Sequence, residues 1–460
     1  MLGPLHLSCL LALLAGSASQ VYASLQVVPG GTWTASNGEH LNAHGTGAIR
    51  VNGTYYIIGE DKSGGSAFQN VNCYSSTDLV RWKYEGALLS RTASGDLGPN
   101  RIVERPKVLY NDKTGKYVLW MHADSSNYGD AKVGVATGDS VCGKYTYLRS
   151  FRPLGFQSRD MGLFKDDDGT GYLLTEDRDN GLRINKLTDD YLDIAGSTST
   201  YLWKDHIESP AMVKIQGRYY MFGSHLTGWD PNDNIYSTST SLTSGWSSWQ
   251  TFADSGSNTY SSQAAYILDY GDGNVVYMGD RWVSSNLQAS TYMWLPLTIS
   301  GAKVTMKNAE AWVPNLSSSS GGAGAWSQPP ADTSYEGEKA AYSGGARDVS
   351  CSGCSGGKAA GYLGGTDNPG KLSFSGVKSD AGGLTTVKIK YNNGDSSPRY
   401  ANVIVNGGSP VKLAFEPNSG NPSISTLNVE LKAGSENTVV FEGIDGGWGP
   451  DVDRLLVPVQ

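Results

Sequence analysis

Short apolar and aromatic runs recur along the chain, and each follows a turn that contains glycine. Runs of this kind, bounded by Gly, Asn and Asp, predict β-strands. Successive turns lie about 50–60 residues apart, the length of one four-stranded blade of a β-propeller. Five copies therefore predict a five-bladed propeller. The alternative, a β-sandwich of unrelated hairpins, fits the regular period less well. The turns are Asn52-Gly53, Thr114-Gly115, Asp168-Gly169, Gln216-Gly217 and Asp272-Gly273.

The pattern changes after the last copy. Residues 317–325 are rich in Ser, Gly and Ala, and Pro329-Pro330 follows, which is the composition of a linker. Beyond it, short strands alternate with Gly, Asn and Asp turns, which predicts a β-sandwich of the jelly-roll type. We therefore expect an all-β chain with four segments: a signal peptide at 1–23, the propeller at 24–314, a linker at 315–333 and the sandwich at 334–460.

The first 23 residues have the pattern of a secretory signal peptide. Cys9–Ala15 is an apolar core, and Val21-Tyr22-Ala23 fits cleavage after a small residue, as does Ala18. We therefore expect the mature protein to be secreted and extracellular. No later stretch reaches the roughly 18 apolar residues of a membrane span, so we expect no membrane association.

The amino-acid composition of the chain favours some classes of binding partner over others. Only 17% of the residues are charged, and the formal net charge of −8 argues against a nucleic-acid partner. The chain holds 59 Gly, 12 Trp and 26 Tyr, which suits short strands, tight turns and aromatic surfaces. Such a surface fits neutral sugars, although its acidic charge can also serve solubility alone. We expect a monomer.

Four cysteines are left once the signal peptide is removed, and an even number in an oxidising compartment predicts disulfide bonds. A redox role for the second pair is the weaker alternative, because no βαβ pattern surrounds it. Two Asn-X-Ser/Thr sequons predict N-glycosylation at Asn52 and Asn315. Pairing within each predicted domain gives Cys73–Cys142 and Cys351–Cys354.

The innermost strands of a propeller converge on its axis, so the residues that open them share one mouth. Blades 2 to 5 open with Glu104, Asp160, Glu208 and Gln263, and blade 1 opens with His44-Gly45. Three acids at equivalent positions are unexpected in a chain this poor in charge. Proline follows two of the motifs, at 106 and 210, and predicts extended backbone for the residue before it.

Clustered carboxyl groups suit glycoside hydrolysis, which needs one group to protonate the leaving oxygen and another to act on the anomeric carbon or on water. Neighbouring acids repel one another and keep one carboxyl protonated. We expect Glu208 to be this acid and Asp160 to be the anion that raises its pKa. The alternative is that the acids only form ion pairs, with Arg105 and Arg159 as the nearest cations in sequence.

These motifs resemble glycoside hydrolase family 43, and more narrowly its fungal exo-β-1,3-galactanases, over about residues 26–313. The resemblance rests on Gly59–Ser63, Asp78–Trp82, Val103–Val108, Ser125–Gly129, Ser158–Asp160 and Gly279–Trp282. It implies an inverting mechanism without a cofactor, Glu208 as the acid and Asp160 as the pKa modulator. Gly45 stands where the family has an Asp base; the galactanase subgroup also lacks that Asp, and Glu104 and Gln263 match positions that it uses. The same resemblance implies sugar contacts at Glu60, Tyr128, Thr227 and Trp229.

The missing Asp leaves the base open between two residues. We predict that Gln263 positions the attacking water. Glu104 is the chemically stronger base and stays as the alternative, although in the resembling subgroup its position lies close to the sugar hydroxyls.

The last segment resembles a family 35 carbohydrate-binding module, through Tyr335–Glu338 and Pro450–Leu455. The resemblance implies a structural calcium ion, since oxygen ligands from both chain ends would pin the termini together. The implied calcium ligands are Glu336, Glu338 and Asp453, and the alternative for each is a solvated turn residue. The implied sugar contacts are Tyr362, Arg399, Asp451 and, as a weaker candidate, Asn418.

Together these patterns predict a secreted exo-β-1,3-galactanase that releases galactose units from the non-reducing end of β-1,3-galactan, the main chain of arabinogalactan. Another family 43 specificity, α-L-arabinofuranosidase or β-xylosidase, is the alternative enzyme, and the missing Asp of blade 1 argues against it. A non-catalytic galactan-binding protein is the alternative outside the enzymes. The retained residues at the mouth of the propeller argue against that.

Overall fold

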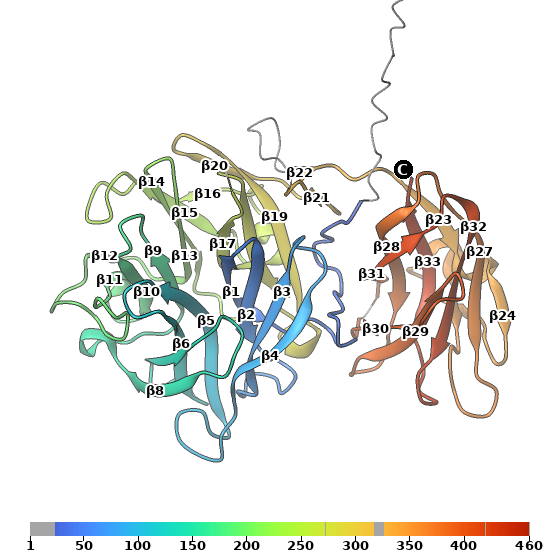
Figure 1. Cartoon of the computed structure of the whole chain (residues 1–460), viewed down its shortest axis with the longest axis horizontal. Coiled ribbons are helices and arrows are strands. Elements are labelled where there is room, and N and C mark those ends of the chain that lie inside the picture. The colour runs from blue at the N-terminus through green and yellow to red at the C-terminus, as the bar shows by residue number, and fades with distance from the viewer. Residues whose placement is uncertain (1–23, 272, 317–325, 419, 460) are drawn as a thin grey trace, which may run out of the picture.

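The computed structural model describes residues 24–271, 273–316, 326–418 and 420–459. They form a β-propeller and a β-sandwich that lie side by side (Figure 1). The predicted signal peptide lies outside the described residues. No helix in the described part of the chain is long and apolar enough to cross a membrane.

Five antiparallel sheets of four strands form the propeller and confirm the predicted number of blades. Blade 1 has β1 (His44–Val51), β2 (Thr54–Glu60), β3 (Asn70–Ser76) and β4 (Lys83–Ser90), and blade 2 has β5 (Arg101–Asn111), β6 (Lys116–Ser125), β7 (Lys132–Gly138) and β8 (Thr146–Phe151). Blade 3 has β9 (Met161–Lys165), β10 (Gly171–Asp177), β11 (Gly181–Lys186) and β12 (Tyr201–Trp203). Blade 4 has β13 (Ile207–Ile215), β14 (Arg218–His225), β15 (Ile235–Ser239) and β16 (Gln250–Thr251), and blade 5 has β17 (Gln263–Asp269), β18 (Val275–Arg281), β19 (Thr291–Ser300) and β20 (Lys303–Met306).

The glycine turns join the first two strands of each blade, as predicted. Gly53, Gly115, Gly169, Gly217 and Gly273 all have φ between 67° and 82°, a left-handed conformation that glycine adopts without a steric penalty. Large aromatic residues fill the space between blades, and Trp120, Trp294 and Trp312 are fully buried. The two ends of the propeller meet where Val27 and Trp312 exchange backbone hydrogen bonds of 2.9 and 3.0 Å.

The C-terminal module is a sandwich of two sheets. One contains β25 (Arg347–Ser350), β26 (Lys358–Gly361), β33 (Asp451–Pro458), β28 (Gly383–Asn392) and β31 (Ser423–Leu431), with β23 (Asp332–Glu336) paired to β33. The other contains β24 (Ala341–Ser343), β27 (Lys371–Ser379), β32 (Gly434–Gly443), β29 (Arg399–Val405) and β30 (Val411–Phe415). Short helical turns are η1 (Pro153–Gly155), α1 (Asn258–Ser261), η2 (Leu287–Ala289), η3 (Gly337–Lys339) and η4 (Ser355–Gly357).

The segment predicted as a linker contains some regular structure. β21 (Val313–Pro314) pairs with β22 (Trp326–Ser327), and β23 already begins at Asp332, two residues before the expected start of the module. Residues 317–325, which carry the Ser/Gly/Ala-rich composition, lie outside the described residues.

The N-terminal segment, residues 24–42, runs between the two domains and binds both (Figure 1). The Thr32 N–H donates to the carbonyl of Ile424 at 2.7 Å, and the Thr426 N–H donates back to Thr32 at 3.1 Å. Nearby, Tyr400 donates to the Glu39 carboxylate at 2.6 Å, and Lys412 pairs with the same group. The module is therefore docked on the propeller by backbone and side-chain hydrogen bonds as well as joined to it by the chain.

Both predicted disulfides are present, Cys73–Cys142 in the propeller and Cys351–Cys354 in the module. Asn52, in the first sequon, is exposed in the turn between β1 and β2. Asn315 is partly buried, and Ser317 of its sequon lies outside the described residues. Glycosylation at both sites stays a prediction.

The two disulfides predict different losses of stability. Cys73–Cys142 spans 69 residues of sequence and Cys351–Cys354 spans 3. In the chain-entropy model, removing the first by double substitution to alanine costs about 4 kcal/mol, and removing the second costs about 2 kcal/mol. Urea unfolding of both double variants and of the wild-type protein measures this. Equal losses for the two pairs would contradict the loop-length argument.

Candidate active site

The first strands of four blades share a local distortion near their start. His44 and Gln263 begin β1 and β17, Glu208 is the second residue of β13, and Glu104 is the fourth residue of β5; the strand register shifts by a bulge shortly after each of them. A bulge bends its strand and redirects the adjacent side chain. In blade 3, Asp160 occupies the matching place, and its carbonyl accepts the N–H of Glu176 at 2.9 Å.

The backbone expected before the two prolines was wrong. Arg105 has φ of 51° and Ser209 has φ of 58°, both in the left-handed region, as has Gly45 of blade 1 with φ of 56°. A proline disfavours the right-handed helical region for the residue before it, and we expected extended backbone. At both positions the bulge imposes a left-handed conformation instead.

The residues at the strand openings line one cavity at the mouth of the propeller, as predicted. Every blade contributes, and so do two tryptophans from loops. The lining residues are Glu60, Glu104, Arg105, His122, Tyr128, Arg159, Asp160, Glu176, Arg178, Glu208, Gly228, Trp229, Gln263 and Trp282. The cavity therefore unites seven of the eight side chains that the sequence assigned to catalysis and to sugar binding in this domain.

Glu208 sits among other carboxyl groups. One oxygen from each of Glu208, Asp160 and Glu176 lies within 4.8 Å of the other two. Burial raises the pKa of Glu208, and the negative charges of Asp160 and Glu176 raise it further, to about 8. The charges of Arg105 and Arg178 oppose this shift only in part. The predicted effect of Asp160 is thus present, with burial as the larger cause and Glu176 as a second anion.

Arg105 links four blades across the axis. Its guanidinium lies 2.7 Å from Asp160 of blade 3 and donates at 2.7 Å to the side-chain oxygen of Gln263 in blade 5. Its backbone N–H, in blade 2, donates at 2.8 Å to Glu60 of blade 1. The alternative expectation of ion pairing therefore holds for Asp160. It holds less strongly for Glu208, whose ion pair with Arg178 is longer, at 3.8 Å.

The amide of Gln263 has partners at both ends. Its oxygen accepts from Arg105 at 2.7 Å and from the indole N–H of Trp282 at 3.0 Å. Both partners can only donate, so they fix the orientation of the amide. Its nitrogen then donates to Glu208 Oε1 at 2.9 Å and to Ser224 at 3.2 Å. A proton on Glu208 is therefore directed to Oε2, the oxygen that Gln263 does not occupy.

The chain enters β17 through a strained turn. Asn258, Thr259, Tyr260 and Ser261 all have φ between 52° and 59°, so α1 is a left-handed turn. Each such residue costs roughly 1–2 kcal/mol unless other contacts compensate. Asp233 accepts the N–H of Asn258 at 2.8 Å, which is one such contact. Strain of this kind gathers at functional sites, and here it lies two residues before Gln263.

Glu104 is held as an anion. Tyr128 donates to its Oε1 at 2.9 Å, and the His122 ring lies 3.3 Å from its Oε2. Burial alone would raise its pKa, but the charge of Lys62 and the hydrogen bond and charge of His122 lower it to about 2. Asp124, 2.8 Å from the other ring nitrogen of His122, completes the arrangement and helps to raise the pKa of that histidine to about 9.

Glu60 occupies the space that a side chain at position 45 would need. A Cβ on Gly45 would lie 2.0 Å from Glu60 Oε1, so no other residue fits without rearrangement. The strand register places His44 rather than Gly45 opposite Glu60, and the His44 ring is buried beside Asp280 at 2.9 Å. The carboxylate that blade 1 contributes to the cavity is therefore Glu60 of its second strand, and not a residue of its first strand.

Trp229 and Trp282 form the aromatic wall, with ring centroids 5.0 Å apart and planes at 77°. Thr227 lies outside the cavity lining and is exposed, and its hydroxyl donates to the carbonyl of Asp230 within the same loop. The structure therefore does not bring Thr227 to the sugar site.

Sequence reasoning missed several lining residues: His122, Glu176, Arg178 and Trp282, and Arg105 as a member of the site. A signal was available for two of them. Glu60 ends the second strand of its blade, and His122 and Glu176 lie in the last part of theirs, beyond the apolar run. In an antiparallel hairpin that end lies beside the opening of the first strand. Equivalent positions in the first and second strands, taken together, would have predicted more of the residues that line the cavity.

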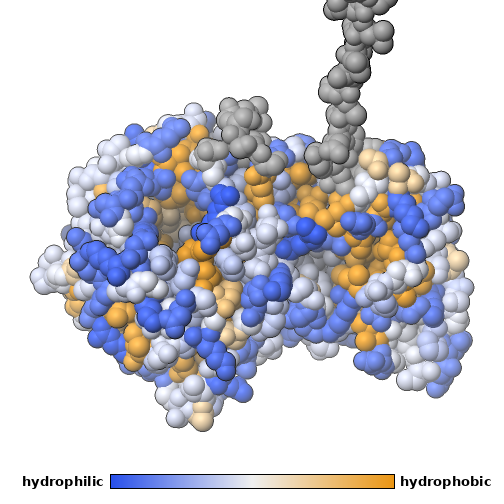
Figure 2. Space-filling view, viewed as in Figure 1, coloured by the Kyte–Doolittle hydropathy of each residue, from blue (hydrophilic) through white to orange (hydrophobic). Residues whose placement is uncertain are grey.

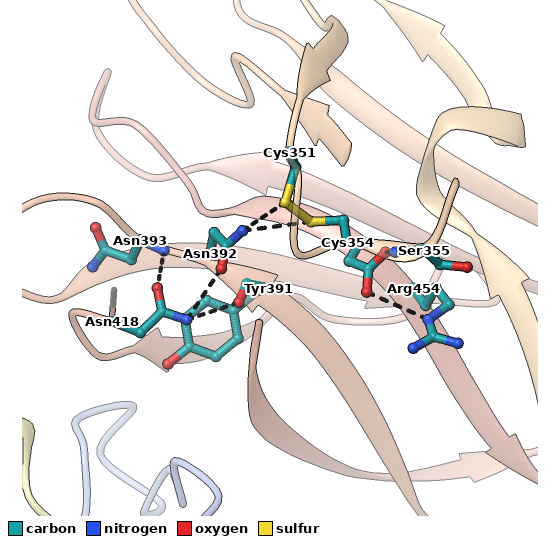
Figure 3. Close-up of a disulfide and its surroundings, with 9 residues drawn as sticks. Cys351, Cys354, Ser355, Tyr391, Asn392, Asn393, Asn418 and Arg454 are labelled. Atoms are coloured by element: carbon teal, nitrogen blue, oxygen red, sulfur yellow. Dashed lines mark hydrogen bonds and ion pairs between the residues drawn. A yellow bond between two sulfur atoms is a disulfide. The ribbon is translucent and has the colours of Figure 1, made fainter. Parts of the chain in front are cut away.

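In the module, the predicted sugar contacts differ in whether their side chains are already held by other residues of the fold. Tyr362 is 43% exposed, and Arg399 and Asp451 interact through their charges. Asn418 is committed to the fold: its oxygen accepts the N–H of Asn393 at 2.8 Å, and its nitrogen donates to the Tyr391 carbonyl at 3.0 Å (Figure 3).

The three predicted calcium ligands surround one loop. Ser355 lies next to the Cys351–Cys354 disulfide (Figure 3). It donates its N–H to Asp453 at 2.9 Å and its hydroxyl to Glu336 at 3.2 Å. One oxygen of Glu336 and one of Glu338 are buried without a hydrogen-bond partner, as expected of ligands to a cation. The compact trios of metal-binding side chains among the described residues, however, lie in the propeller cavity. A calcium ion here would also need carbonyl or water oxygens.

Comparison with known proteins agrees with this geometry. A model of the glycosyl hydrolases family 43 matches residues 43–291, more than half of the chain. A second model, described as the CBM13 domain of an α-galactosidase, matches residues 371–457. The C-terminal domain is thus similar to a carbohydrate-binding module, under a different family number from the expected 35.

Solved structures cover more of the chain. The exo-β-1,3-galactanase of Phanerochaete chrysosporium, crystallised with galactose, is 38% identical, covers 94% of this chain and 100% of its own, and superposes with a TM-score of 0.65. The exo-β-1,3-galactanase of Clostridium thermocellum is 25% identical, covers 94% of this chain and 100% of its own, and has a TM-score of 0.62.

A curated relative is more distant. The arabinoxylan arabinofuranohydrolase of Bacillus subtilis is 28% identical over 250 residues, which is 44% of this chain and 48% of that protein. The chain thus spans less than half the length of this relative. The match of the family 43 model over the blades, together with 38% identity to a solved structure along almost the whole chain, shows that the chain belongs to glycoside hydrolase family 43.

Proposed function

We propose that the protein is a secreted exo-β-1,3-galactanase that releases galactose from the non-reducing end of β-1,3-galactan. The observation that carries the proposal is Glu208, a carboxyl group with a pKa of about 8 beside two carboxylates in a cavity that all five blades line. We infer the substrate from the galactanases that match along most of the chain. The signal-like first 23 residues support secretion, and we keep the expectations of a monomer and of an extracellular location.

Glu208 would donate its proton to the oxygen of the bond that breaks. The Gln263 amide occupies Glu208 Oε1, so the proton sits on Oε2. Arg178, 3.8 Å from that oxygen, would stabilise the carboxylate left after donation. Glu60, Glu104 and the Trp229 wall would bind the terminal sugar by hydrogen bonds to its hydroxyls and by stacking on its apolar face.

We propose inversion, with water attacking from the side of the sugar opposite Glu208. Such a mechanism places the second group roughly 6.5–9.5 Å from the acid. Gln263 donates to Glu208 at 2.9 Å, so it could position the water only if the amide exchanged partners when the sugar binds. We keep Gln263 as the predicted residue and Glu104, an anion at neutral pH, as the alternative.

Two other functions compete less well. The similarity to an arabinoxylan arabinofuranohydrolase favours an arabinofuranosidase, but the Glu60 carboxylate fills the space that the family's blade 1 Asp would take at position 45. A binding protein without activity would not need a carboxyl group with so high a pKa. Release of reducing sugar from β-1,3-galactan, but not from arabinan or xylan, tests the proposal. No release from any of the three would favour the binding protein.

Glu208→Gln should lower the turnover of β-1,3-galactan by roughly 10²–10⁴-fold, because the amide cannot donate the proton at the required acidity. Its oxygen can still accept from Gln263, so galactose binding should persist. Initial rates and calorimetric binding measure the two effects, with the exposed Glu310→Gln as the matched control. Near-normal turnover by Glu208→Gln would remove it from the role of acid.

The pKa of Glu208 also makes stability depend on pH. The folded protein holds this proton more tightly than the unfolded chain, where the pKa is about 4.5. The stabilisation is therefore complete below about pH 4.5 and is lost as the pH rises towards 8. Glu208→Gln is neutral throughout, so it should melt above the wild-type protein at pH 8, by more than it does at pH 5. The same difference at both pH values in scanning calorimetry would contradict the assigned pKa.

Azide separates the two candidate bases, because it can replace a missing base but not a missing sugar contact. We expect azide to restore turnover to Gln263→Ala and to give a glycosyl azide of inverted configuration, identified by NMR. Rescue of Glu104→Ala and not of Gln263→Ala would transfer the role to Glu104.

We propose that the module binds galactose-type sugars and holds calcium with Glu336, Glu338 and Asp453. Calcium there would bridge the two ends of the module and stabilise it, by about 2.7 kcal/mol at a concentration 100 times its dissociation constant. Calcium should therefore raise the melting temperature of the wild-type protein and of the exposed control Glu430→Gln, but not of Asp453→Asn. A wild-type melting temperature that calcium leaves unchanged would reject the ion.

A further inference from the structure

Lys62 is a buried cation in contact with residues of the cavity wall, and neither the sequence nor the proposed mechanism gives it a role. It lies two residues beyond β2, and only 2% of its side chain is exposed. Its ammonium group is 2.5 Å from Glu60 Oε2 and 3.4 Å from Glu104 Oε1. Its backbone N–H donates to Asn42 at 2.8 Å, so the N-terminal segment fixes its place. A charge this deeply buried is tolerated only where its neighbours compensate it.

The same ammonium group contacts the aromatic wall. It lies 5.4 Å from the ring centre of Trp229 and 5.8 Å from that of Trp282, within the range of cation–π attraction. Trp282 directly follows β18, whereas Trp229 comes from the exposed loop between β14 and β15. Lys62 therefore contacts both tryptophans of the aromatic wall and the two carboxylates of Glu60 and Glu104.

The charge of Lys62 opposes the protonation of Glu60. Burial raises the pKa of Glu60, and Lys62 provides the largest opposing effect, which limits this rise without cancelling it. The Arg105 N–H already occupies Oε1 of Glu60 at 2.8 Å. Without the lysine, the other oxygen would face Glu104 with no cation between them, and one of the two carboxyl groups would take up a proton. A protonated carboxyl group offers a sugar hydroxyl fewer acceptor sites.

We propose that Lys62 is a positioning residue for the terminal sugar: it keeps Glu60 and Glu104 as hydrogen-bond acceptors and holds the Trp229 indole against Trp282. The proposal rests on the proposed function, because the sugar is the ligand of this wall. Lys62 pairs with acids of blades 1 and 2, whereas Glu208 belongs to blade 4 with its own anions. Loss of Lys62 therefore weakens sugar binding and leaves proton donation in place.

Three variants of the full chain test this. Lys62→Met keeps the length of the side chain without its charge, and Lys62→Arg keeps a cation that can pair with carboxylates and stack on indole. Lys83→Met, at a lysine that is 66% exposed, is the matched control. The measurements are KM and kcat on a short β-1,3-galactooligosaccharide, the pH profile of kcat, and the change in tryptophan fluorescence on adding galactose.

We expect Lys62→Met to raise KM and the galactose dissociation constant roughly tenfold or more, as for a lost hydrogen bond between charged groups. The basic limb of the kcat profile should not move, and the fluorescence change should shrink. Lys62→Arg should recover part of the binding, and Lys83→Met should match the wild-type protein. Wild-type KM for Lys62→Met, or a shifted basic limb at unchanged KM, would overturn the proposal.

Two further results distinguish a failure of the role proposed for Lys62 from a failure of the proposed function or of folding. If the wild-type protein neither binds galactose nor cleaves β-1,3-galactan, the proposed function fails and not the role of Lys62 alone. If Lys62→Met does not fold, Trp229→Phe reports on the aromatic half. Trp229→Phe should weaken galactose binding by a larger factor in the wild-type background than in the Lys62→Arg background. A similar factor in both backgrounds would mean that Lys62 and Trp229 act independently, and that result would contradict the proposal.

Discussion

The structure depends on one electrostatic constraint: five carboxyl groups, Glu60, Glu104, Asp160, Glu176 and Glu208, line one cavity, and four of them are buried. Buried carboxylates repel one another and must be paired or protonated. Arg105 compensates Asp160, Lys62 compensates Glu60, and His122 with Lys62 compensates Glu104. Glu208 receives the least compensation and keeps its proton. The distribution of cations, more than any single acid, therefore defines which carboxyl group can act as the proton donor.

This distribution is possible because the fold brings short segments from every blade to the axis. Bulges near the start of β5, β13 and β17 follow Glu104, Glu208 and Gln263, which line the cavity, and the backbone of Arg105 and Ser209 next to them is left-handed. The module adds a second constraint from the side, since residues 24–42 pair with its sheet and also supply Asn42 to Lys62. Figure 2 shows hydrophobic residues among polar ones on the visible face of both the propeller and the module.

Much of this could be predicted from the sequence, and the rest could not, for a physical reason. Glycine turns and apolar runs are local, so they predicted five blades, and equivalent positions in those blades predicted Glu104, Asp160, Glu208 and Gln263. Both disulfides followed from pairing within domains. The role of Arg105 depends on partners in other blades, which no local pattern contains. Thr227 was placed in the site by resemblance alone, and its hydroxyl instead closes its own loop. The backbone before Pro106 and Pro210 was wrong because a tertiary bulge outweighed a local preference.

The central claim is that Glu208 holds a proton at neutral pH. Infrared difference spectroscopy between the wild-type protein and Glu208→Gln measures this directly, because only a protonated carboxyl group shows the carbonyl stretch of an acid. The account predicts one such band at pH 6 that is present in the wild-type protein, absent from the variant, and lost from the wild-type protein as the pH passes through about 8. A difference spectrum at pH 6 that shows only carboxylate bands would contradict it.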